Sequence, residues 1–222
     1  MTDPSRVGDL YRFRFNEVER ERKAGVWKVL CRHFFQRLVP REGTLLDVGC
    51  GFGEFLNHIE AARRIGMDLN EESREHLAPG IEFHRASALD LDRFPESSID
   101  LIFCSNVLEH LPSKGDVDLF LAASRRILRP GAALLVLGPN IRFTGGAYWD
   151  FWDHHTPITD RSLREAMHLQ GLTVDLCIPR FLPYTTREPL PQHDFLVRMY
   201  LDMPFAWRWL GKQFLVRGVR PR

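Results

Sequence analysis

The feature that most constrains the fold is a glycine-rich loop that directly follows a short apolar run. Residues 44–48 have the composition of a buried strand, and Gly49, Gly51 and Gly53 come immediately after them. Glycines at such a turn let the backbone bend tightly and approach a ligand with no Cβ in the way. The pattern therefore predicts a loop that holds a nucleotide-like ligand at the carboxyl end of a strand.

Apolar runs and helical patterns alternate along the rest of the chain. Ser113 and Asp116, for example, match a capping box at the start of a helix. Strands that alternate with helices indicate a parallel sheet that is covered on both faces. We therefore predict an α/β fold, with a doubly wound, mostly parallel sheet and helices on both faces. The expected strands are 44–48, 64–68, 81–84, 99–104, 132–137, 172–178 and 213–219, and the expected helices are 16–39, a stretch that begins at Phe55, 113–127 and 159–170.

Two acidic residues near the strand ends indicate the charge of the ligand. Asp47 lies inside the strand that leads into the glycine loop, and Asp68 ends the next predicted strand, 19 positions after Gly49. The Asp68 carboxylate is suited to accept hydrogen bonds from a ribose diol. Beside a pyrophosphate Asp47 would be repelled, whereas beside an amino group and a sulfonium it is favourable. The charge pattern favours S-adenosylmethionine over NAD, and an NAD(P)-dependent oxidoreductase is the alternative.

Four motifs, in the order of the family, resemble those of class I S-adenosylmethionine-dependent methyltransferases. They are residues 45–53, 65–70, 97–111 and 126–140, so the resemblance covers about residues 40–180. It implies a Rossmann-like, seven-stranded sheet whose last strand is antiparallel, a role that residues 213–219 would fill. It also implies a methyltransferase that uses S-adenosylmethionine as its cofactor. A non-catalytic partner subunit that only binds S-adenosylmethionine is a further alternative.

The same motifs imply which residues contact the cofactor. Ser87 stands where the family often has an aspartate that holds the adenine amino group, and Asp90 is the other candidate for that contact. The expected set of cofactor-binding residues is Asp47, Gly49, Cys50, Gly51, Gly53, Asp68, Leu69, Ser87, Ala88, Asp90, Ser105 and Asn106.

Histidines that follow two of the strands are the candidate catalytic groups. Methyl transfer from a sulfonium needs a general base only when the acceptor atom must lose a proton. We expect His154 or His155 to be that base, with Asp150 or Asp153 orienting its ring, unless these histidines only anchor the loop. His110 either borders the acceptor site or packs beneath a loop. Adjacent histidines on extended chain point to opposite sides, and without a third ligand at a suitable spacing we predict no metal site.

The expected acceptor is a small molecule or a glycan that is methylated on a hydroxyl oxygen. The preference for oxygen depends on the candidate histidine base, and the formal net charge of +1 argues against a nucleic-acid substrate. Trp149, Asp150, Arg180 and Tyr184 are the candidate acceptor-binding residues. The aromatic and arginine-containing stretch 180–191 suits a sugar or an anionic intermediate.

The two ends of the chain frame this core. Tyr11, Phe13, Phe15 and Trp27 are expected to form either a lid over the cofactor or a helix stripe packed on the sheet. The basic, aromatic tail suggests a helix plus an edge strand, with contact to an anionic lipid surface as the alternative. Together these features predict one methyltransferase domain over residues 1–222. Its parts are a helical lid (1–40), a cofactor-binding core (41–180), a substrate-side insertion (181–211) and a final strand and tail (212–222).

The remaining features concern the compartment of the protein. The N-terminus has no apolar run behind a basic start, and no stretch approaches the roughly 20 apolar residues of a membrane-spanning helix. The 4 cysteines lie far apart, which is typical of reduced thiols. We expect a soluble, cytoplasmic protein that is a monomer or a homodimer.

Overall fold

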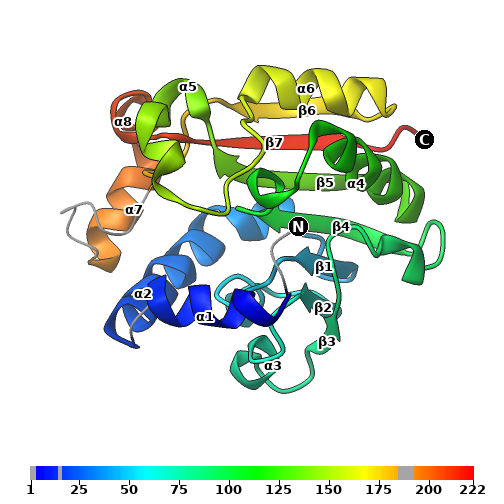
Figure 1. The fold of residues 1–222 in the computed structure, drawn as a ribbon, viewed down its shortest axis with the longest axis horizontal. Helices are drawn as coiled ribbons and strands as arrows, with labels where there is room; N and C mark the ends of the chain where they lie inside the picture. Colours follow the sequence, from blue (N-terminus) through cyan, green and yellow to red (C-terminus); the bar gives the residue numbers. More distant parts are fainter. Residues whose placement is uncertain (1–3, 15–16, 185–192) are drawn as a thin grey trace.

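Seven strands form one sheet among the residues that the computed structural model describes, which are 4–14, 17–184 and 193–222. Their order across the sheet is β3-β2-β1-β4-β5-β7-β6, and β7 runs antiparallel to both of its neighbours (Figure 1). This arrangement confirms the predicted doubly wound, mostly parallel sheet. The strands are β1 (Thr44–Val48), β2 (Arg63–Asp68), β3 (Glu82–Arg85), β4 (Ile99–Ser105), β5 (Leu128–Pro139), β6 (Thr173–Ile178) and β7 (Gln213–Val219).

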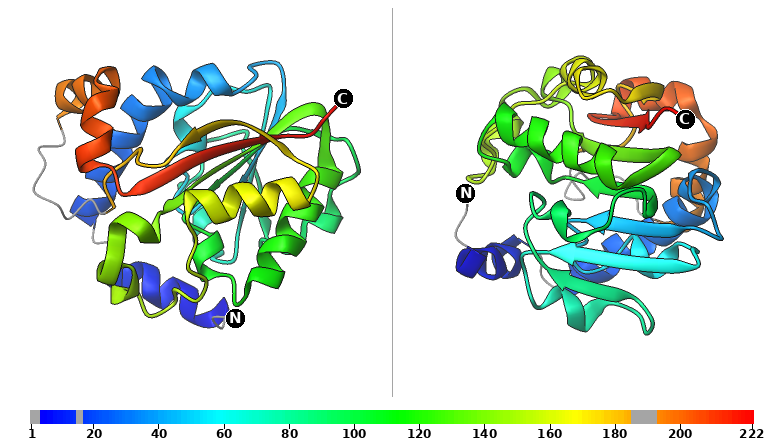
Figure 2. Two further views of the ribbon diagram at one scale, coloured as in Figure 1. Left: turned by 90° about the horizontal axis from the view of Figure 1, so that it is seen from above. Right: turned by 90° about the vertical axis from the view of Figure 1, so that its right-hand side faces the viewer.

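Helices cover both faces of the sheet (Figure 2). Along β5, Leu134 and Val136 belong to the apolar cluster that includes α4 (Lys114–Ile127) and α6 (Asp160–Leu169). Leu135 and Leu137 belong to the cluster on the opposite face, with α2 (Glu17–His33), α7 (Asp194–Asp202) and α8 (Pro204–Leu210). A strand that is buried on both faces has to be apolar throughout, and this explains the continuous apolar run in β5.

Short helices and turns connect these elements. The remaining α-helices are α1 (Pro4–Arg14), α3 (Ser73–His76) and α5 (Ile141–Thr144). The 3-10 turns are η1 (Phe35–Leu38), η2 (Leu56–His58), η3 (Leu91–Arg93), η4 (Leu108–His110) and η5 (Gly145–Asp150). Ser113 caps α4 as predicted, since its hydroxyl accepts a hydrogen bond from the Asp116 amide, and Thr159 begins α6 with a capping box.

Three sequence-based expectations about elements are wrong. The helix expected from Phe55 is only the turn η2, because nine residues separate Gly53 from Arg63 at the start of β2, too few for a helix and its return. The helix predicted over 16–39 ends at His33 and is followed by η1. The final strand is not an edge strand, because β7 pairs with β5 and β6. The stretch 181–211 contains the helices α7, which contacts α2, and α8, which contacts α7.

The parallel strands β1, β2, β4 and β5 end at the same edge of the sheet, and the glycine loop follows β1 there. In open α/β sheets ligands bind outside this edge. Among the described residues, no helix has both the length and the apolar character needed to cross a bilayer.

Candidate active site

Two adjoining cavities lie at this edge of the sheet. The main cavity, of about 500 Å³, is bounded by the glycine loop, α2, the ends of β4 and β5, and α7 with α8. The nucleoside cavity, of about 130 Å³, is bounded by Asp68 and the loop 86–89. Gly49, Val107 and His110 line both cavities. This layout suits a ligand that has a nucleoside at one end and a reactive group at the other.

Gly49 gives the ligand its access to the backbone. Its φ is +75°, and a Cβ at this position would lie 2.2 Å from Cγ2 of Val107, so a larger residue fits neither the conformation nor the space. Gly51 also has a positive φ and lines the main cavity. Gly53, in contrast, lines neither cavity. A Cβ at this position would lie 2.7 Å from Cδ2 of Leu77, so the glycine allows the loop to pack closely there.

The Asp68 carboxylate shapes the loop that it faces. One of its oxygens accepts a hydrogen bond from the Gly51 amide at 2.9 Å, and the other accepts from the Asn70 amide at 2.8 Å. Burial raises the pKa of Asp68, although these amide bonds oppose the rise. Each oxygen retains a lone pair, so the carboxylate can still accept bonds from a ribose diol.

Asp47 and Glu54 make the donor end of the main cavity acidic, and Asp68 adds a third carboxylate in the adjoining nucleoside cavity. Burial, with the charges of Glu54 and Asp68, raises the pKa of Asp47 well above its usual range. Lys23 on α2 forms an ion pair with Glu54 at 2.8 Å. Three buried carboxylates facing one lysine leave this end short of positive charge, which fits the ammonium and the sulfonium of S-adenosylmethionine.

The loop after β3 forms the wall of the nucleoside cavity. Ser87 and Ala88 line this cavity together with Leu69, whereas Asp90 does not. The Asp90 carboxylate instead accepts a hydrogen bond from the Ser87 amide at 2.8 Å and closes the turn. Of the two candidates for the adenine contact, Ser87 is therefore the one at the cavity.

The remaining predicted cofactor residues lie along the main cavity. Cys50, Ser105 and Asn106 all line it, and Asn106 adopts a positive φ of 54° as the chain turns after β4. Burial and the nearby acids raise the pKa of the Cys50 thiol, which keeps it neutral and unreactive.

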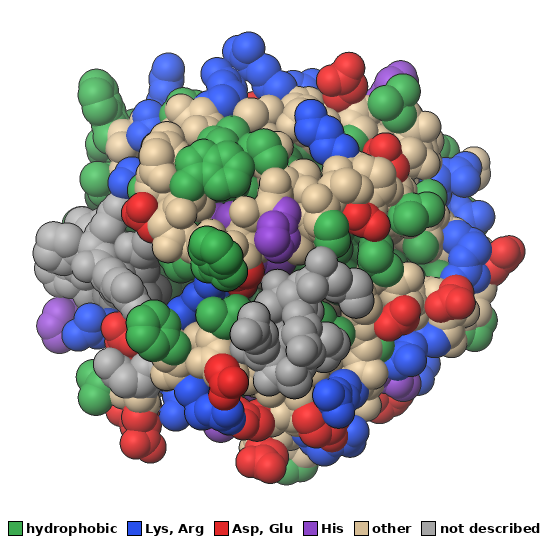
Figure 3. Space-filling model, in the orientation of Figure 1, with side chains coloured by type: hydrophobic (Ala, Val, Ile, Leu, Met, Phe, Trp, Pro, Cys, Tyr) green, Lys and Arg blue, Asp and Glu red, His purple; other side chains and the backbone are tan. Residues whose placement is uncertain are grey.

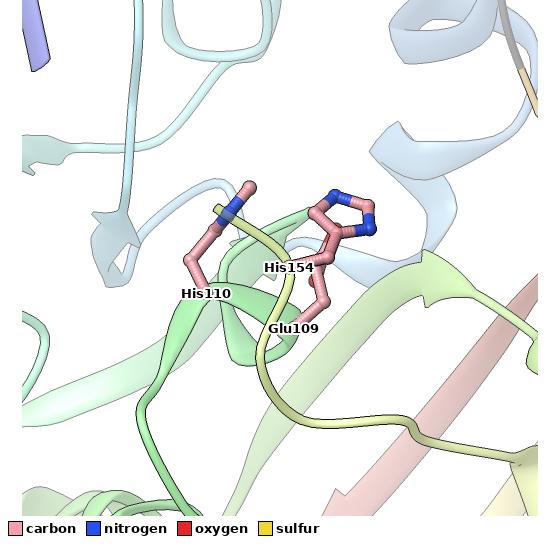
Figure 4. Close-up of side chains that lie close together, drawn as sticks. All are labelled: Glu109, His110 and His154. Atoms are coloured by element: carbon pink, nitrogen blue, oxygen red, sulfur yellow. The ribbon is translucent and has the colours of Figure 1, made fainter. Parts of the chain in front are cut away.

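Glu109, His110 and His154 project together toward the main cavity, which all three line (Figure 4). His110 Nδ1 lies 3.0 Å from the backbone oxygen of Asp153 and 3.3 Å from its carboxylate. The His154 ring stacks on Phe151 at 4.9 Å, and its buried Nδ1 has no hydrogen-bond partner. Burial lowers the pKa of His154 to about 4, so its ring is neutral near pH 7.

These three side chains also have the composition of a metal site. Their candidate ligand atoms all lie within 4.8 Å of one another, and one carboxylate with two imidazoles is a common set of zinc ligands. The sequence offered no third ligand at a suitable spacing from the adjacent histidines, but the fold brings Glu109 and His110 beside His154. Burial raises the pKa of Glu109, and this favours the protonated carboxyl over a charged ligand.

Arg14 is a site residue that the sequence analysis missed. Its guanidinium forms an ion pair with the Asp153 carboxylate, lies over the Phe151 ring at 5.2 Å, and borders both cavities. Burial opposes ionisation of Asp153, but the hydrogen bond from Arg14 and the charges of His110 and Arg14 lower its pKa overall. No sequence signal links positions 14, 110 and 153, because they meet only in the folded chain.

Several predicted site residues lie outside the cavities. His155 and Trp149 are exposed, and neither they nor Asp150 line a cavity. Arg180 donates hydrogen bonds to the backbone oxygens of Gly211 and Trp209, so it fixes the end of α8. Tyr184, in contrast, lines the main cavity.

Two aromatic residues of the expected lid are described, and they differ. Phe13 is 86% exposed and covers nothing, whereas Trp27 is buried, stacks on Phe35 and lines the main cavity. The Tyr11 side chain and Phe15 lie outside the described part of the chain, as do residues 185–191 of the stretch expected to bind a sugar.

The fold and the site define a Rossmann-like protein with a pocket for a cationic nucleoside. A family of methyltransferase domains matches residues 20–176 of the chain. A probable S-adenosylmethionine-dependent methyltransferase of Mycolicibacterium smegmatis is 31% identical over 150 residues, which are 64% of this chain and 57% of the relative. A ubiquinone biosynthesis O-methyltransferase of Aromatoleum aromaticum is 30% identical over 108 residues, 45% of each chain. These matches span about half the length of the curated relatives.

A solved structure supports the same fold. An S-adenosylmethionine-dependent methyltransferase of Thermotoga maritima superposes with a TM-score of 0.67 over 96% of this chain and 98% of that one, at 17% identity. The chain belongs to the class I S-adenosylmethionine-dependent methyltransferases, and S-adenosylmethionine is its cofactor. This membership sets aside the alternative of an oxidoreductase that uses NAD(P).

Proposed function

We propose that this methyltransferase transfers the methyl group of S-adenosylmethionine to a hydroxyl oxygen of a small molecule, with His110 as the general base. The observation that carries the proposal is the position of His110. Its ring borders both cavities, where donor and acceptor would meet, and its Nδ1 faces the Asp153 carboxylate. An imidazole held at one nitrogen by a carboxylate is oriented to accept a proton at the other.

The bound cofactor supplies a methyl group on a cationic sulfur, and the protein supplies position and proton transfer. Asp68 and the glycine loop hold the nucleoside, and the acidic donor end faces the cationic part. Nε2 of His110 takes the hydroxyl proton as the oxygen attacks. Asp153, whose pKa is lowered, stabilises the imidazolium that results.

His154 has a different part in this proposal. Because its pKa is lowered to about 4, the ring is neutral and carries one N–H group. With that hydrogen on the unpartnered Nδ1, the ring would donate a hydrogen bond to the oxygen of the acceptor hydroxyl, whose own proton stays available to His110. The name of the Aromatoleum relative, an O-methyltransferase, supports oxygen as the methylated atom.

We further propose that α1 acts as a lid, as the expected domain organisation has it. Arg12 pairs with Glu72 beyond β2, and Arg14 pairs with Asp153 on the loop after β5, so α1 is anchored on both sides of the nucleoside cavity. A closed α1 would keep water away from the sulfonium.

The test is a labelled-donor assay on the His110→Ala variant with a hydroxyl acceptor found by screening. Loss of a general base should lower kcat/KM about 10²- to 10⁴-fold. Affinity for S-adenosylhomocysteine, measured by calorimetry, should stay near that of the wild type. Asp153→Asn should give a smaller loss in kcat/KM, and His155→Ala, the matched control outside the cavities, should give none. Full activity of His110→Ala would refute the proposed base.

A further inference from the structure

The walls of the main cavity are apolar away from its donor end. Trp27 and Leu30 of α2, Phe103 of β4 and Leu137 of β5 form one side. The other side is formed by residues of α7 and α8 and the segment before them: Leu182, Leu196, Val197, Met199, Met203, Ala206 and Leu210. A surface of this kind binds a ligand by removing apolar area from water, at about 25 cal/mol per Å². It is a poor match for a molecule that carries many hydroxyl groups.

The charged groups of this cavity are already engaged. Among the described residues, the basic side chains that line it are Arg14 and Lys23. Arg14 is paired with Asp153, and Lys23 with Glu54. These two ion pairs leave the cavity without an excess of positive charge for a phosphate or carboxylate group. An anionic acceptor is therefore as poor a match as a glycan.

Most polar groups of the acceptor end are used within the protein. The Tyr200 hydroxyl donates to the backbone oxygen of Phe181, and Nε2 of Gln213 donates to that of Pro183 at 2.6 Å. At this end, three lining atoms have no hydrogen-bond partner among the described residues: His154 Nδ1, the Tyr184 hydroxyl and Gln213 Oε1. Buried polar atoms of this kind cost free energy until a ligand satisfies them.

The unpartnered atoms lie in one region of the cavity. The rings of His154 and Tyr184 both contact Phe151, at 4.9 Å and 5.7 Å between centroids. Gln213 pairs with Pro139 at the end of β5, one residue from Gly138, and Glu109 approaches Gly138. Away from its donor end, the cavity therefore has one polar spot, beside the proposed base His110, and its other walls are apolar.

The apolar lining continues to the protein surface. Met199 on α7 and Leu210 at the end of α8 both line the cavity, yet they are 41% and 40% exposed. Hydrophobic side chains are also exposed among the charged ones on the face of the molecule drawn in Figure 3. An apolar chain that starts at the polar spot can therefore follow the lining of α7 and α8 to the protein surface.

We propose that the acceptor is an amphiphile, with one hydroxyl-bearing head that occupies the polar spot and an apolar body that lies along α7 and α8. The proposal rests on the proposed function, because the head group is the hydroxyl that is methylated. It selects an apolar small molecule over the glycan that the sequence left open.

The experiment measures the binding of 4-alkylphenols of increasing chain length to the full chain saturated with S-adenosylhomocysteine. Calorimetry should show affinity that rises about three- to fourfold with each added methylene until the cavity is filled. Glucose and maltose should not bind at the same concentrations. Affinity that is flat along the series, or sugars that bind as well as the phenols, would overturn the proposal.

Variants at the cavity mouth provide the matched comparison. Met199→Glu and Leu210→Glu place a charge on the apolar lining at partly exposed positions, where the fold tolerates it, and should abolish the gain with chain length. Phe195→Glu, on α7 but 72% exposed and outside the lining, should leave the gain unchanged. An equal loss in all three variants would argue against this binding path.

A separate readout distinguishes this proposal from the proposed function. Product analysis with labelled S-adenosylmethionine reports whether a bound alkylphenol becomes a methyl ether. Phenols that bind with the expected chain-length dependence but are not methylated would leave the acceptor class standing and remove the assignment to oxygen. Methylation of a hydroxyl on a compound with no apolar body would support the assignment to oxygen and overturn the proposed amphiphilic acceptor.

Discussion

The donor end and the acceptor end of the main cavity are constructed in opposite ways. The donor end consists of the end of β1 and the loop that follows it, and its lining combines exposed backbone at the glycines with the buried carboxylates of Asp47 and Glu54. The acceptor end is assembled from α2, the loop after β5, α7 and α8, and it is mainly apolar. The donor end is therefore an acidic surface made by residues that are close in sequence. The acceptor end is an apolar surface made by residues that come together only in the folded chain.

The largest effect is expected from a substitution that distorts the backbone of the glycine loop at the donor end. Gly49→Ala forces an alanine into a positive φ and places its Cβ 2.2 Å from Val107. The free energy of unfolding should fall by about 2–5 kcal/mol, and S-adenosylhomocysteine should no longer bind measurably. Urea unfolding and calorimetry measure the two effects.

Gly146→Ala is the control for this prediction, because a Cβ there meets nothing within 4 Å. Its free energy of unfolding should change by less than about 1 kcal/mol. If Gly49→Ala kept wild-type affinity for the cofactor, the loop would not approach the ligand as described.

The next prediction removes charge from the donor end without changing its shape. Asp47→Asn loses a charge-assisted contact to the cofactor, so affinity for S-adenosylmethionine should fall about ten- to hundredfold. Burial and the neighbouring acids raise the pKa of Asp47 in the free protein, and a bound cation should lower it again, so binding should be coupled to proton release. Wild-type affinity should therefore rise with pH, whereas Asp47→Asn should lose this component of the pH dependence in calorimetric titrations.

Asp47→Asn should make the cofactor-free protein more stable, although it weakens cofactor binding. A buried carboxyl with a raised pKa holds a proton that the unfolded chain releases above about pH 4, so its contribution to the stability of the free protein declines as pH rises above that value. Asp47→Asn should then raise the melting temperature of the cofactor-free protein at neutral pH. A lower melting temperature would mean that Asp47 stabilises the empty fold, contrary to its assignment as a residue kept for the cofactor.

The contrast between the two ends also explains what the sequence could predict. The order of elements, the glycine loop and the acids at its edges are local patterns, so spacing alone pointed to Asp47, Gly49 and Asp68, which each line at least one of the two cavities. Nucleotide loops of this kind carry their chemistry in consecutive residues. Gly53 is the exception, because its glycine is needed for packing against Leu77.

At the acceptor end the sequence singled out the loop after β5, but of its predicted residues His154 lines a cavity and Trp149, Asp150 and His155 do not. Spacing could not tell that His154 turns inward while His155 is exposed, or that Asp153 faces His110. Arg180 was expected to meet the acceptor because it is basic, but its donors hold backbone carbonyls of the α8 segment. These assignments depend on pairings between residues 29 to 139 positions apart, which no local period encodes.

The smallest expected effect tests what activates the acceptor end. If His110 is the base, exhaustive dialysis against EDTA should change kcat/KM by less than about twofold, because no step needs an ion. The assay repeats the labelled-donor measurement before and after dialysis, with Mn²⁺ and Zn²⁺ added back. A large loss that a divalent cation restores in the wild type but not in Glu109→Gln would identify Glu109, His110 and His154 as metal ligands. In that case a metal-bound hydroxyl would replace the imidazole as the means of removing the proton, and the acceptor end would bind by charge as the donor end does.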